Sequence, residues 1–378
     1  MYSVHSYGQM LADTPRLQAY IAALKTTVKP GSVVLDLGCG PGLFSLLACR
    51  LGARRVFAVE PDDVIQLARE AAGANDCADR IEFLQNFSTD ITLPEPADII
   101  ISDLRGVLPW YQKHIPSIID ARRRLLAANG VLIPQVDVLW AAIVEVPERY
   151  SEIVDPWEQE VNLSAARRTV TNTWRKARIN TEQLLTKPLC WSRINYREIE
   201  SADFKSELSF SVQRSGTAHG VAVWFDSELT DQISFSNNPA GPELIYGQAF
   251  FPFPHPVEVS QGYRIELSLG ANLVTDDYVW GWDTSILTPE SSQPKVSFKQ
   301  TTLFGVPLSP AQLRKQSAAY KPTLNESGQV ERFILQSMNG DASLEEIAER
   351  LRESFPQRYA DWKAALNDVT KVSLEFSE

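Results

Sequence analysis

The chain is poor in the residues that usually hold metals or form disulfides. Its 378 residues include four histidines and four cysteines, and the cysteines are Cys39, Cys49, Cys77 and Cys190. They stand at none of the spacings that are typical of zinc sites. We therefore expect no metal site, and cysteines that are reduced and buried. The chain also lacks any run of about 18 apolar residues, so a membrane-spanning helix is not expected.

Basic residues are in deficit as well. There are 36 Lys and Arg against 47 Asp and Glu, which gives a formal net charge of −11. A chain of this sign repels phosphate backbones, so neither nucleic acid nor a membrane surface is an expected partner. The N-terminus MYSVHSYGQML lacks the basic start and apolar core of a secretory signal, so the expected location is cytoplasmic.

Apolar strand patterns alternate with helical patterns over residues 1–136. Strands are expected at 33–37, 56–60, 81–85, 97–102 and 131–134. Helices are expected after Asp13 and at about 42–50, 62–74 and 113–127. Strands that are apolar throughout and separated by helices indicate a parallel sheet covered on both faces. The fold class is therefore α/β, with a Rossmann-like first domain.

The pattern changes at residue 137. Short, alternating, aromatic-rich segments broken by Pro, Gly and Asn predict an antiparallel β-barrel or sandwich domain over 137–315. The polar segment 162–186 fits no strand, and we expect it to form either a projecting arm or a helical insertion.

A third, acidic module is expected at 322–378. Ser343 and Glu346 form a capping-box pattern, and Ile347, Leu351 and Phe355 lie on one helical face. The final apolar run VSLEF (372–376) is predicted to be a strand. The module is therefore expected to be small and helical, or of the winged-helix type.

The segment VLDLGCGPG (34–42) carries the most specific chemical signal. It places three glycines between a strand and a helix, namely Gly38, Gly40 and Gly42. Such a turn lets a ligand approach the backbone closely. A dinucleotide fingerprint would have its third glycine at position 43, where Leu43 stands. Asp36 precedes the turn and would repel a pyrophosphate but attract a cationic ligand.

Glu60 ends the next strand, where a carboxylate can accept hydrogen bonds from both hydroxyls of a ribose. Together with Asp36 and the glycine turn, it predicts an S-adenosylmethionine site. Adenine recognition is expected from the loop after the third strand, between Asn86 and Asp90, which includes Ser88 and Thr89.

Over about residues 2–290, the chain resembles the protein arginine methyltransferases. The carrying stretches are YGQMLADTPRLQAY (7–20), VLDLGCGPG, VFAVE (56–60), IIISDLRGVLPWYQ (99–112) and VLIP (131–134). The resemblance implies that Met10 packs beside the sulfonium and that Arg16 pairs with the methionyl carboxylate. It also implies that 162–186 corresponds to a dimerisation arm, hence a possible homodimer.

The chain departs from this family at the acceptor site. Asp103 and Gln112 stand where the family has two catalytic glutamates, and Leu244-Ile245-Tyr246 replaces its Thr-His-Trp loop. Tyr246 is expected to form an aromatic wall for the substrate. Tyr7 is expected to lie on a segment that covers the cofactor and to contact the substrate.

These departures bear on the acceptor. Two carboxylates hold a guanidinium bidentately, whereas one aspartate and an amide supply half that charge. Losing a buried charged partner costs on the order of 2–5 kcal/mol. We therefore expect N- or O-methylation of another group on a peptide, protein or small molecule, with Asp103, Arg105 and Gln112 as catalytic residues.

Three alternatives remain open at this stage. Arg105 can receive an anionic acceptor, or it can form only a structural ion pair with Asp103. The chain can be a scaffold that binds S-adenosylmethionine with weak catalysis or none, or a peptide-binding protein. Arginine methylation also survives if Asp283 or Glu243 takes the missing carboxylate's place.

Residues 322–378 resemble, more faintly, the peptide-chaperone winged helix of pyrroloquinoline quinone biosynthesis. The stretch NGDASLEEIAERLRESFP and the run VSLEF carry this resemblance. It implies that a peptide substrate binds as an added strand beside an edge strand.

Overall fold

The structure is a computed structural model that describes residues 3–157 and 160–377. The chain forms two compact units, one that ends at Pro307 and one that begins at Leu308. In the described part of the chain, no helix is both long and apolar enough to cross a membrane.

The first part of the larger unit is built on a five-stranded parallel sheet with the order β3-β2-β1-β4-β5. Its strands are β1 (Val33–Leu37), β2 (Arg55–Val59), β3 (Ile81–Leu84), β4 (Ala97–Ser102) and β5 (Leu126–Ile133). Every residue of β1 is buried, as its unbroken apolar run predicts for a central parallel strand. The prediction of a Rossmann-like α/β domain is confirmed.

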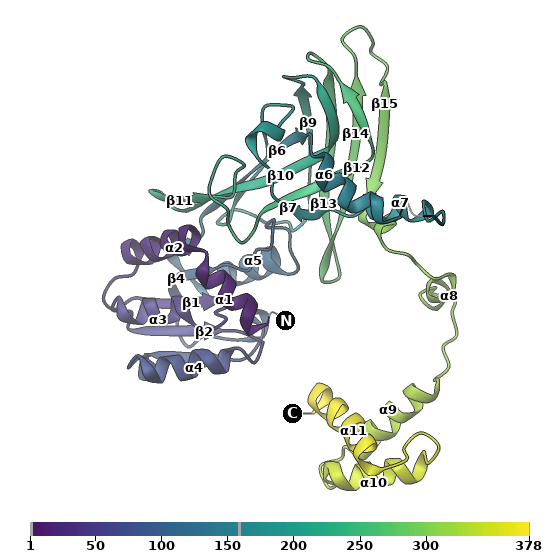
Figure 1. The fold of residues 1–378 in the computed structure, drawn as a ribbon. Helices are drawn as coiled ribbons and strands as arrows, with labels where there is room; N and C mark the ends of the chain where they lie inside the picture. Colours follow the sequence, from purple (N-terminus) through teal and green to yellow (C-terminus); the bar gives the residue numbers. More distant parts are fainter. Residues whose placement is uncertain (1–2, 158–159, 378) are drawn as a thin grey trace. The chain divides into compact units, whose positions relative to one another are not determined.

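Five helices accompany this sheet: α1 (Val4–Ala12), α2 (Thr14–Thr27), α3 (Leu43–Arg50), α4 (Ile65–Ala74) and α5 (His114–Arg124). Helix α3 packs against β1 and β2, and α5 packs against β5 (Figure 1). Short 3-10 turns follow at η1 (Ala78–Arg80) and η2 (Ser88–Asp90). The predicted helix 113–127 was too long at its end, because Leu126 already pairs with Ala97 of β4.

The β-domain consists of two antiparallel sheets. The first has the order β7-β12-β10-β6-β8, with β11 beside β10, and the second has the order β15-β14-β13-β9. The strands are β6 (Val136–Val144), β7 (Arg175–Ala177), β8 (Leu189–Asn195), β9 (Phe204–Ser211), β10 (Gly216–Thr230), β11 (Ile233–Ser236), β12 (Gln248–Val259), β13 (Arg264–Val274), β14 (Asp277–Leu287) and β15 (Val296–Thr301).

Aromatic side chains join the two sheets. The ring of Trp282 on β14 lies 5.3 Å from that of Phe251 on β12, measured between centroids. Trp191 on β8 lies 5.4 Å from Phe204 on β9. Trp110, from the loop after β4, enters the same cluster at 4.8 Å from Trp191. The apolar core is therefore continuous from the parallel sheet into the β-domain.

The segment that fitted no predicted strand lies against the β-domain. It follows α6 (Pro147–Val154) and η3 (Asp155–Trp157), and it contains α7 (Ala165–Thr171), β7 and η4 (Thr181–Gln183). Helix α7 contacts β12 and the turn η5 (Thr302–Gly305), while Ile179 and Leu185 are fully buried. Helix α7 agrees with the helical insertion, and the role of an arm stays a prediction. The expectation that 162–186 fits no strand was wrong, because β7 pairs with β12.

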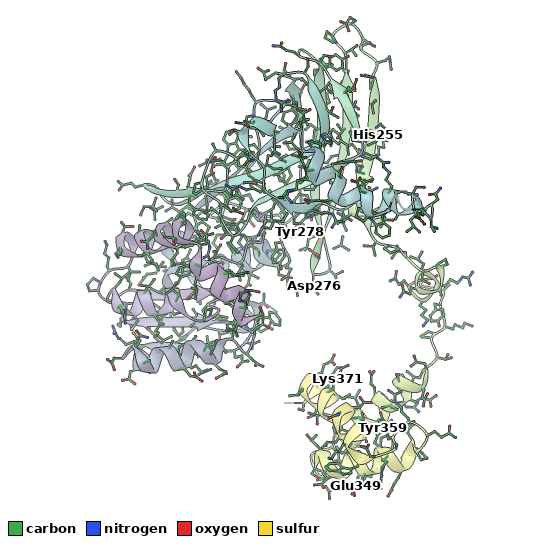
Figure 2. All side chains as sticks on the ribbon, in the orientation of Figure 1. His255, Asp276, Tyr278, Glu349, Tyr359 and Lys371 are labelled. Carbon is green, nitrogen blue, oxygen red and sulfur yellow. The ribbon has the colours of Figure 1, made fainter. Side chains whose placement is uncertain are left out.

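The C-terminal unit is helical, with α8 (Pro310–Lys315), α9 (Glu326–Ser337), α10 (Leu344–Ser354) and α11 (Trp362–Phe376). The capping box of Ser343 and Glu346 is present. Tyr359, labelled in Figure 2, donates to Asp368 at 2.6 Å. The predicted strand 372–376 was wrong. Ala365, Val369 and Val372 recur at helical spacing and bury one face of α11 in the bundle.

Candidate active site

The glycine loop lies at the carboxyl end of β1 with a backbone that only glycine adopts easily. The φ angles of Gly38, Gly40 and Gly42 are +75°, +51° and +83°. A Cβ on Gly40 would stand 2.8 Å from the ring of Tyr7, and one on Gly38 would collide with Leu104. The glycine loop is therefore in close contact with helix α1, through Tyr7, and with the loop after β4, through Leu104.

Glu60 stands beside this loop at the end of β2. Its Oε2 accepts the amide N–H of Gly40 at 3.0 Å, and its Oε1 accepts that of Asp62 at 3.1 Å. Burial raises the pKa of Glu60, although these two hydrogen bonds oppose the shift. A carboxylate offers about four lone-pair sites, so two remain for a pair of hydroxyl groups. This is the geometry expected of a ribose-binding carboxylate.

Asp36 lies differently from the sequence expectation. Its carboxylate is 1% exposed and accepts the Ser45 hydroxyl of α3 at 2.6 Å. Burial raises its pKa to about 7, with Ser45 opposing the rise. Asp36 therefore links β1 to α3. Because its carboxylate is buried, this position does not favour direct contact with a cationic ligand.

The loop expected to bind adenine follows β3. The carbonyl of Ser88 accepts a hydrogen bond from Arg124 of α5 at 2.9 Å, which anchors the loop to that helix. Thr89 is exposed, and its hydroxyl lies 3.1 Å from Asp90. The loop leaves the carboxyl edge of the sheet, as a nucleotide-binding loop of this fold must. Its role in adenine binding stays a prediction.

Arg16 lies in the first turn of α2, and Asp13 caps that helix. Asp13 accepts the Arg16 N–H at 3.4 Å and also the N–H of Ile245 at 2.7 Å. Arg16 in turn donates from Nη1 to the carbonyl of Met10 at 3.1 Å. The cap thus joins α1, α2 and the loop before β12. The sequence pattern marks Asp13 only as the start of a helix and does not indicate its contact with Ile245.

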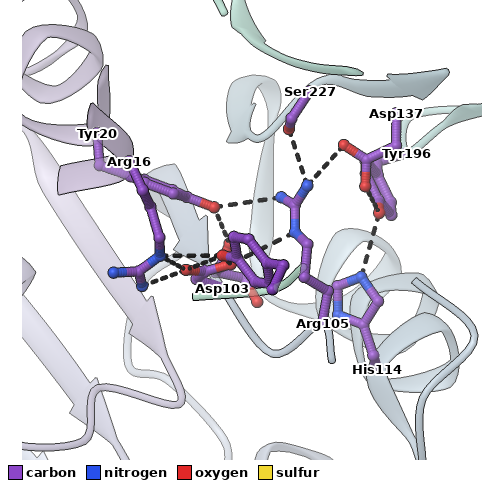
Figure 3. Close-up of polar contacts among 10 residues, drawn as sticks. Arg16, Tyr20, Asp103, Arg105, His114, Asp137, Tyr196 and Ser227 are labelled. Atoms are coloured by element: carbon purple, nitrogen blue, oxygen red, sulfur yellow. Dashed lines mark hydrogen bonds and ion pairs between the residues drawn. The ribbon is translucent and has the colours of Figure 1, made fainter. Parts of the chain in front are cut away.

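The Asp103 carboxylate is the centre of the site (Figure 3). Its Oδ2 accepts from Arg16 Nε at 2.7 Å and also from Arg16 Nη2. The Tyr246 hydroxyl lies 2.7 Å from Oδ1 and 2.8 Å from Oδ2. Burial alone would raise the pKa of Asp103, but the guanidinium groups of Arg16 and Arg105 and these hydrogen bonds outweigh it. The pKa lies below its usual value, so Asp103 is ionised.

Arg105 has a fully buried side chain and turns toward the β-domain. Its Nη1 donates to Asp137 of β6 at 2.7 Å and to Ser227 of β10 at 2.8 Å. Its Nη2 donates to the Tyr20 hydroxyl at 3.2 Å, while its Nε lies 3.4 Å from Asp103 Oδ1. These contacts use three of its five N–H donors, and the whole side chain is buried, so this position does not favour an anionic acceptor. Arg105 also joins more partners than the expected simple pair with Asp103.

The network continues beyond Arg105 to α5. Tyr196 donates to Asp137 at 2.6 Å, so its oxygen must accept from Nε2 of His114, 3.1 Å away. Burial and the charge of Arg105 lower the pKa of His114 to about 3, so the ring is neutral. Sequence analysis missed Asp137 and Tyr196. A carboxylate inside the apolar strand VDVLWAAIV was the only available signal.

Gln112 stands apart from this network. It is exposed, has a φ of +43°, and donates to the Tyr111 hydroxyl at 3.2 Å. The two alternative carboxylates are also on the surface: Asp283 is exposed on β14, and Glu243 lies 3.9 Å from Arg178. Among the described residues, Asp103 is therefore the carboxylate that the acceptor loop (residues 103–113, between β4 and α5) itself carries in the network, and Asp137 of β6 contacts this loop through Arg105.

Tyr7 and Tyr246 are the two predicted substrate contacts, and they pack against different parts of the site. Tyr7 packs on the glycine loop, and burial together with Glu60 and Asp62 raises its pKa. Tyr246 is buried beside Arg16, with 5.9 Å from the guanidinium carbon to the ring centre. Tyr246 is thus the hydroxyl donor to Asp103, and its role as an aromatic wall for the substrate stays a prediction.

Comparison with known families matches each part of the larger unit to methyltransferases. Residues 137–282 match the arginine methyltransferase oligomerization subdomain. Residues 15–142 match the ribosomal protein L11 methyltransferase family.

Curated relatives point the same way. The chain is 30% identical over 247 residues to a probable protein arginine N-methyltransferase 6 of Arabidopsis thaliana, covering 61% of this chain and 57% of that protein. It is 26% identical over 280 residues to protein arginine N-methyltransferase 1 of Saccharomyces cerevisiae, covering 70% and 79%.

Solved structures share the fold. A chain of the Trypanosoma brucei PRMT1 enzyme-prozyme heterotetrameric complex with AdoHcy has a TM-score of 0.72 at 22% identity, covering 80% of this chain and 98% of that one. Arabidopsis thaliana protein arginine methyltransferase 10 has a TM-score of 0.70 at 23% identity, covering 79% and 97%. In sequence the chain is therefore similar to protein arginine methyltransferases, and it shares their fold.

Proposed function

We propose that the chain transfers a methyl group from S-adenosylmethionine to an uncharged nitrogen or oxygen of a peptide, protein or small molecule. The observation that carries this proposal is the state of Asp103. Its carboxylate is buried, ionised and already bound by one guanidinium and one hydroxyl, with a second guanidinium 3.4 Å away.

The cofactor end of the site supports binding of S-adenosylmethionine. Glu60 keeps two lone-pair sites for the ribose hydroxyls, and the glycine loop admits the ligand without side chains in its way. Arg16 uses three of its five N–H donors on Asp103, Tyr246 and Met10. The remaining two can hold the methionyl carboxylate.

The acceptor end argues against a guanidinium. The guanidinium of a substrate would compete with Arg16 for the oxygens of Asp103. The neutral amide of Gln112 offers no second negative charge to hold it. A hydroxyl, amide or neutral amine needs only one hydrogen bond to aim its lone pair at the methyl group. In a displacement from a sulfonium, such alignment supplies much of the catalysis. Asp103 would accept that hydrogen bond, and Tyr246 would fix the carboxylate. As the bond from the acceptor to the methyl carbon forms, the carbon–sulfur bond breaks to give S-adenosylhomocysteine, and the acceptor's proton passes through Asp103 to solvent.

A second candidate is a scaffold that binds the cofactor and does little or no catalysis. The exposed position of Gln112 and the full engagement of Asp103 favour it. The two candidates share cofactor binding and differ in whether a labelled methyl group reaches any acceptor.

The assembly state is a separate proposal. The match of residues 137–282 to an oligomerization subdomain supports a homodimer. Light scattering after size exclusion would give twice the chain mass if the proposal holds, and the mass of one chain would contradict it.

Isothermal titration with S-adenosylmethionine and S-adenosylhomocysteine tests the cofactor first. We expect binding by wild type, a large loss in Glu60→Ala, and no loss in the matched control Glu82→Ala. Glu82 is a half-buried carboxylate on the neighbouring strand β3, paired with Arg55. Labelled methyl transfer to proteins and peptides of a cell extract then separates enzyme from scaffold. No binding of either ligand would overturn both candidates.

A further inference from the structure

A buried ion pair joins Arg105 of the acceptor loop to Asp137 of β6, and the transfer reaction itself does not require it. The side chains of Arg105 and Asp137 are both 0% exposed and lie 2.7 Å apart. Four further hydrogen bonds hold the pair: Ser227 and Tyr20 accept from Arg105, Tyr196 donates to Asp137, and His114 donates to Tyr196. The pair therefore joins the parallel-sheet domain to β6 and β10 (Figure 3).

The four formal charges of the side-chain network in Figure 3 sum to zero. The network contains two guanidinium groups, those of Arg16 and Arg105, and two carboxylates, those of Asp103 and Asp137. His114 is neutral, and the pKa values of Tyr20, Tyr196 and Tyr246 are raised by burial, so these tyrosines keep their protons. An added cation would find no uncompensated negative charge in this network.

The geometry gives Arg105 a direct electrostatic effect on Asp103. Its Nε–H is buried with no hydrogen-bond partner among the described residues and lies 3.4 Å from Asp103 Oδ1. Asp137 holds the other end of the guanidinium, on the side away from Asp103. At such distances a fixed positive charge lowers the attraction of Asp103 for any second cation, because water is excluded.

We propose that Arg105, held in place by Asp137, is a specificity-determining residue that occupies the electrostatic place of a cationic acceptor and so restricts the site to uncharged ones. This inference rests on the proposed function and deepens it by naming the residues that choose the acceptor class. Asp137 and Tyr196 act through Arg105 as positioning residues.

A purely structural role predicts a different outcome. Buried ion pairs are weak contributors to stability, and their replacement by neutral groups is often tolerated when both partners change together. A structural pair would therefore alter the free energy of unfolding without altering the choice between charged and neutral ligands. The ratio of two affinities distinguishes the roles.

The test uses the full chain saturated with S-adenosylhomocysteine. Two glycine-serine peptides that differ only in one central residue, Arg or Gln, are titrated into wild type and into the double variant Arg105→Gln/Asp137→Asn. We expect wild type to bind the Arg peptide no better than the Gln peptide. The double variant keeps the net charge of the network, but it removes the positive charge that lies 3.4 Å from Asp103, whereas Asp137 contacts the other end of the Arg105 guanidinium. It should therefore bind the Arg peptide about tenfold tighter. The affinity for the Gln peptide should change much less.

Two controls accompany the double variant. Arg193→Gln/Glu228→Gln removes an exposed pair on β8 and β10, 3.1 Å apart, and should leave both affinities unchanged. Arg105→Lys keeps the charge and should retain weak binding of the Arg peptide. If the double variant does not fold, Arg105→Lys still tests the proposal, because a preference of this variant for the Arg peptide would overturn it.

The outcomes separate this inference from the proposed function. Failure of wild type to bind S-adenosylhomocysteine overturns the proposed function before any peptide is added. With that binding intact, an unchanged Arg-to-Gln affinity ratio in the folded double variant overturns the specificity role. Preference of wild type or Arg105→Lys for the Arg peptide overturns it as well.

Discussion

The hydroxyl of Tyr246 lies 2.7 Å from Oδ1 and 2.8 Å from Oδ2 of Asp103, and it is also 2.9 Å from Nε of Arg16. One phenol from the β-domain thus contacts both members of an ion pair in the cofactor-binding domain. Tyr246 stands in a loop before β12, so this contact fixes the acceptor loop against the β-domain. The position of Asp103 consequently depends on both domains.

Replacing Tyr246 by Phe tests this dependence. The change keeps the ring and removes a hydrogen bond to a buried charge, which is worth about 1.5–3 kcal/mol. We expect methyl transfer to fall by roughly tenfold or more, while S-adenosylhomocysteine binding changes little. Single-turnover transfer of a labelled methyl group and isothermal titration measure the two quantities.

Tyr278→Phe is the matched control. Tyr278 is a buried tyrosine of β14, labelled in Figure 2, and its hydroxyl has no hydrogen-bond partner among the described residues. Its loss should leave the transfer rate unchanged. Equal effects of the two substitutions would show that the hydroxyl of Tyr246 does not act through Asp103.

Arg16→Gln is expected to destabilise the fold and weaken cofactor binding together. The substitution leaves Asp103 buried without its main partner, which costs about 3–5 kcal/mol when one half of a buried pair is removed. Arg54→Gln removes half of an exposed pair with Glu95 and should cost no more than about 1 kcal/mol. Urea unfolding of both variants, with and without S-adenosylhomocysteine, gives the comparison. Equal losses of stability would contradict the assignment of Arg16 as a buried partner.

Much of the fold follows from local sequence patterns. Unbroken apolar runs such as 33–37 become the central parallel strands, and the capping box at Ser343 starts α10. The prediction of a strand at 372–376 was wrong because a run of five residues with alternating apolar and polar side chains also occurs at the end of a helix. Only its continuation back to Ala365 at helical spacing decides the matter.

The cofactor loop was readable for the same reason, since its glycines and Glu60 are close in sequence. The acceptor network was not. Asp103 and Arg105 are separated from Asp137, Tyr196 and Ser227 by up to 124 positions along the chain, and pairing across that distance depends on the packing of two domains. Sequence therefore identified Arg105 as chemically notable but left the direction of its side chain open. The structure turns it toward β6.

Asp36 predicts a distinctive dependence of stability on pH. Its pKa is raised to about 7 in the folded state by burial, above its ordinary value near 4. The folded chain then binds more protons than the unfolded chain between these values, so stability at this site falls as pH rises from 4 to 7. Asp36→Asn lacks this proton uptake. We expect the unfolding free energy of wild type to decline relative to Asp36→Asn by roughly 2–4 kcal/mol across this range.

Chemical denaturation at several pH values measures that difference, with both proteins in the same buffers. Other carboxylates contribute equally to the two proteins and cancel in the difference. A difference that stays constant from pH 4 to pH 7 would show that Asp36 titrates normally in the folded chain.

The C-terminal unit should be separable from cofactor binding. Ile347 is 1% exposed in the core of the α9–α11 bundle, and Ile347→Asp buries a charge there without a partner. We expect this variant of the full chain to lose protection of α9, α10 and α11 from hydrogen exchange. Its affinity for S-adenosylhomocysteine should match that of wild type, because the glycine loop, Glu60 and Arg16 belong to the other unit. Leu344→Asp, at a position 38% exposed on the same helix, is the control and should keep the bundle protected. A loss of cofactor affinity in Ile347→Asp alone would show that the two units depend on each other for binding.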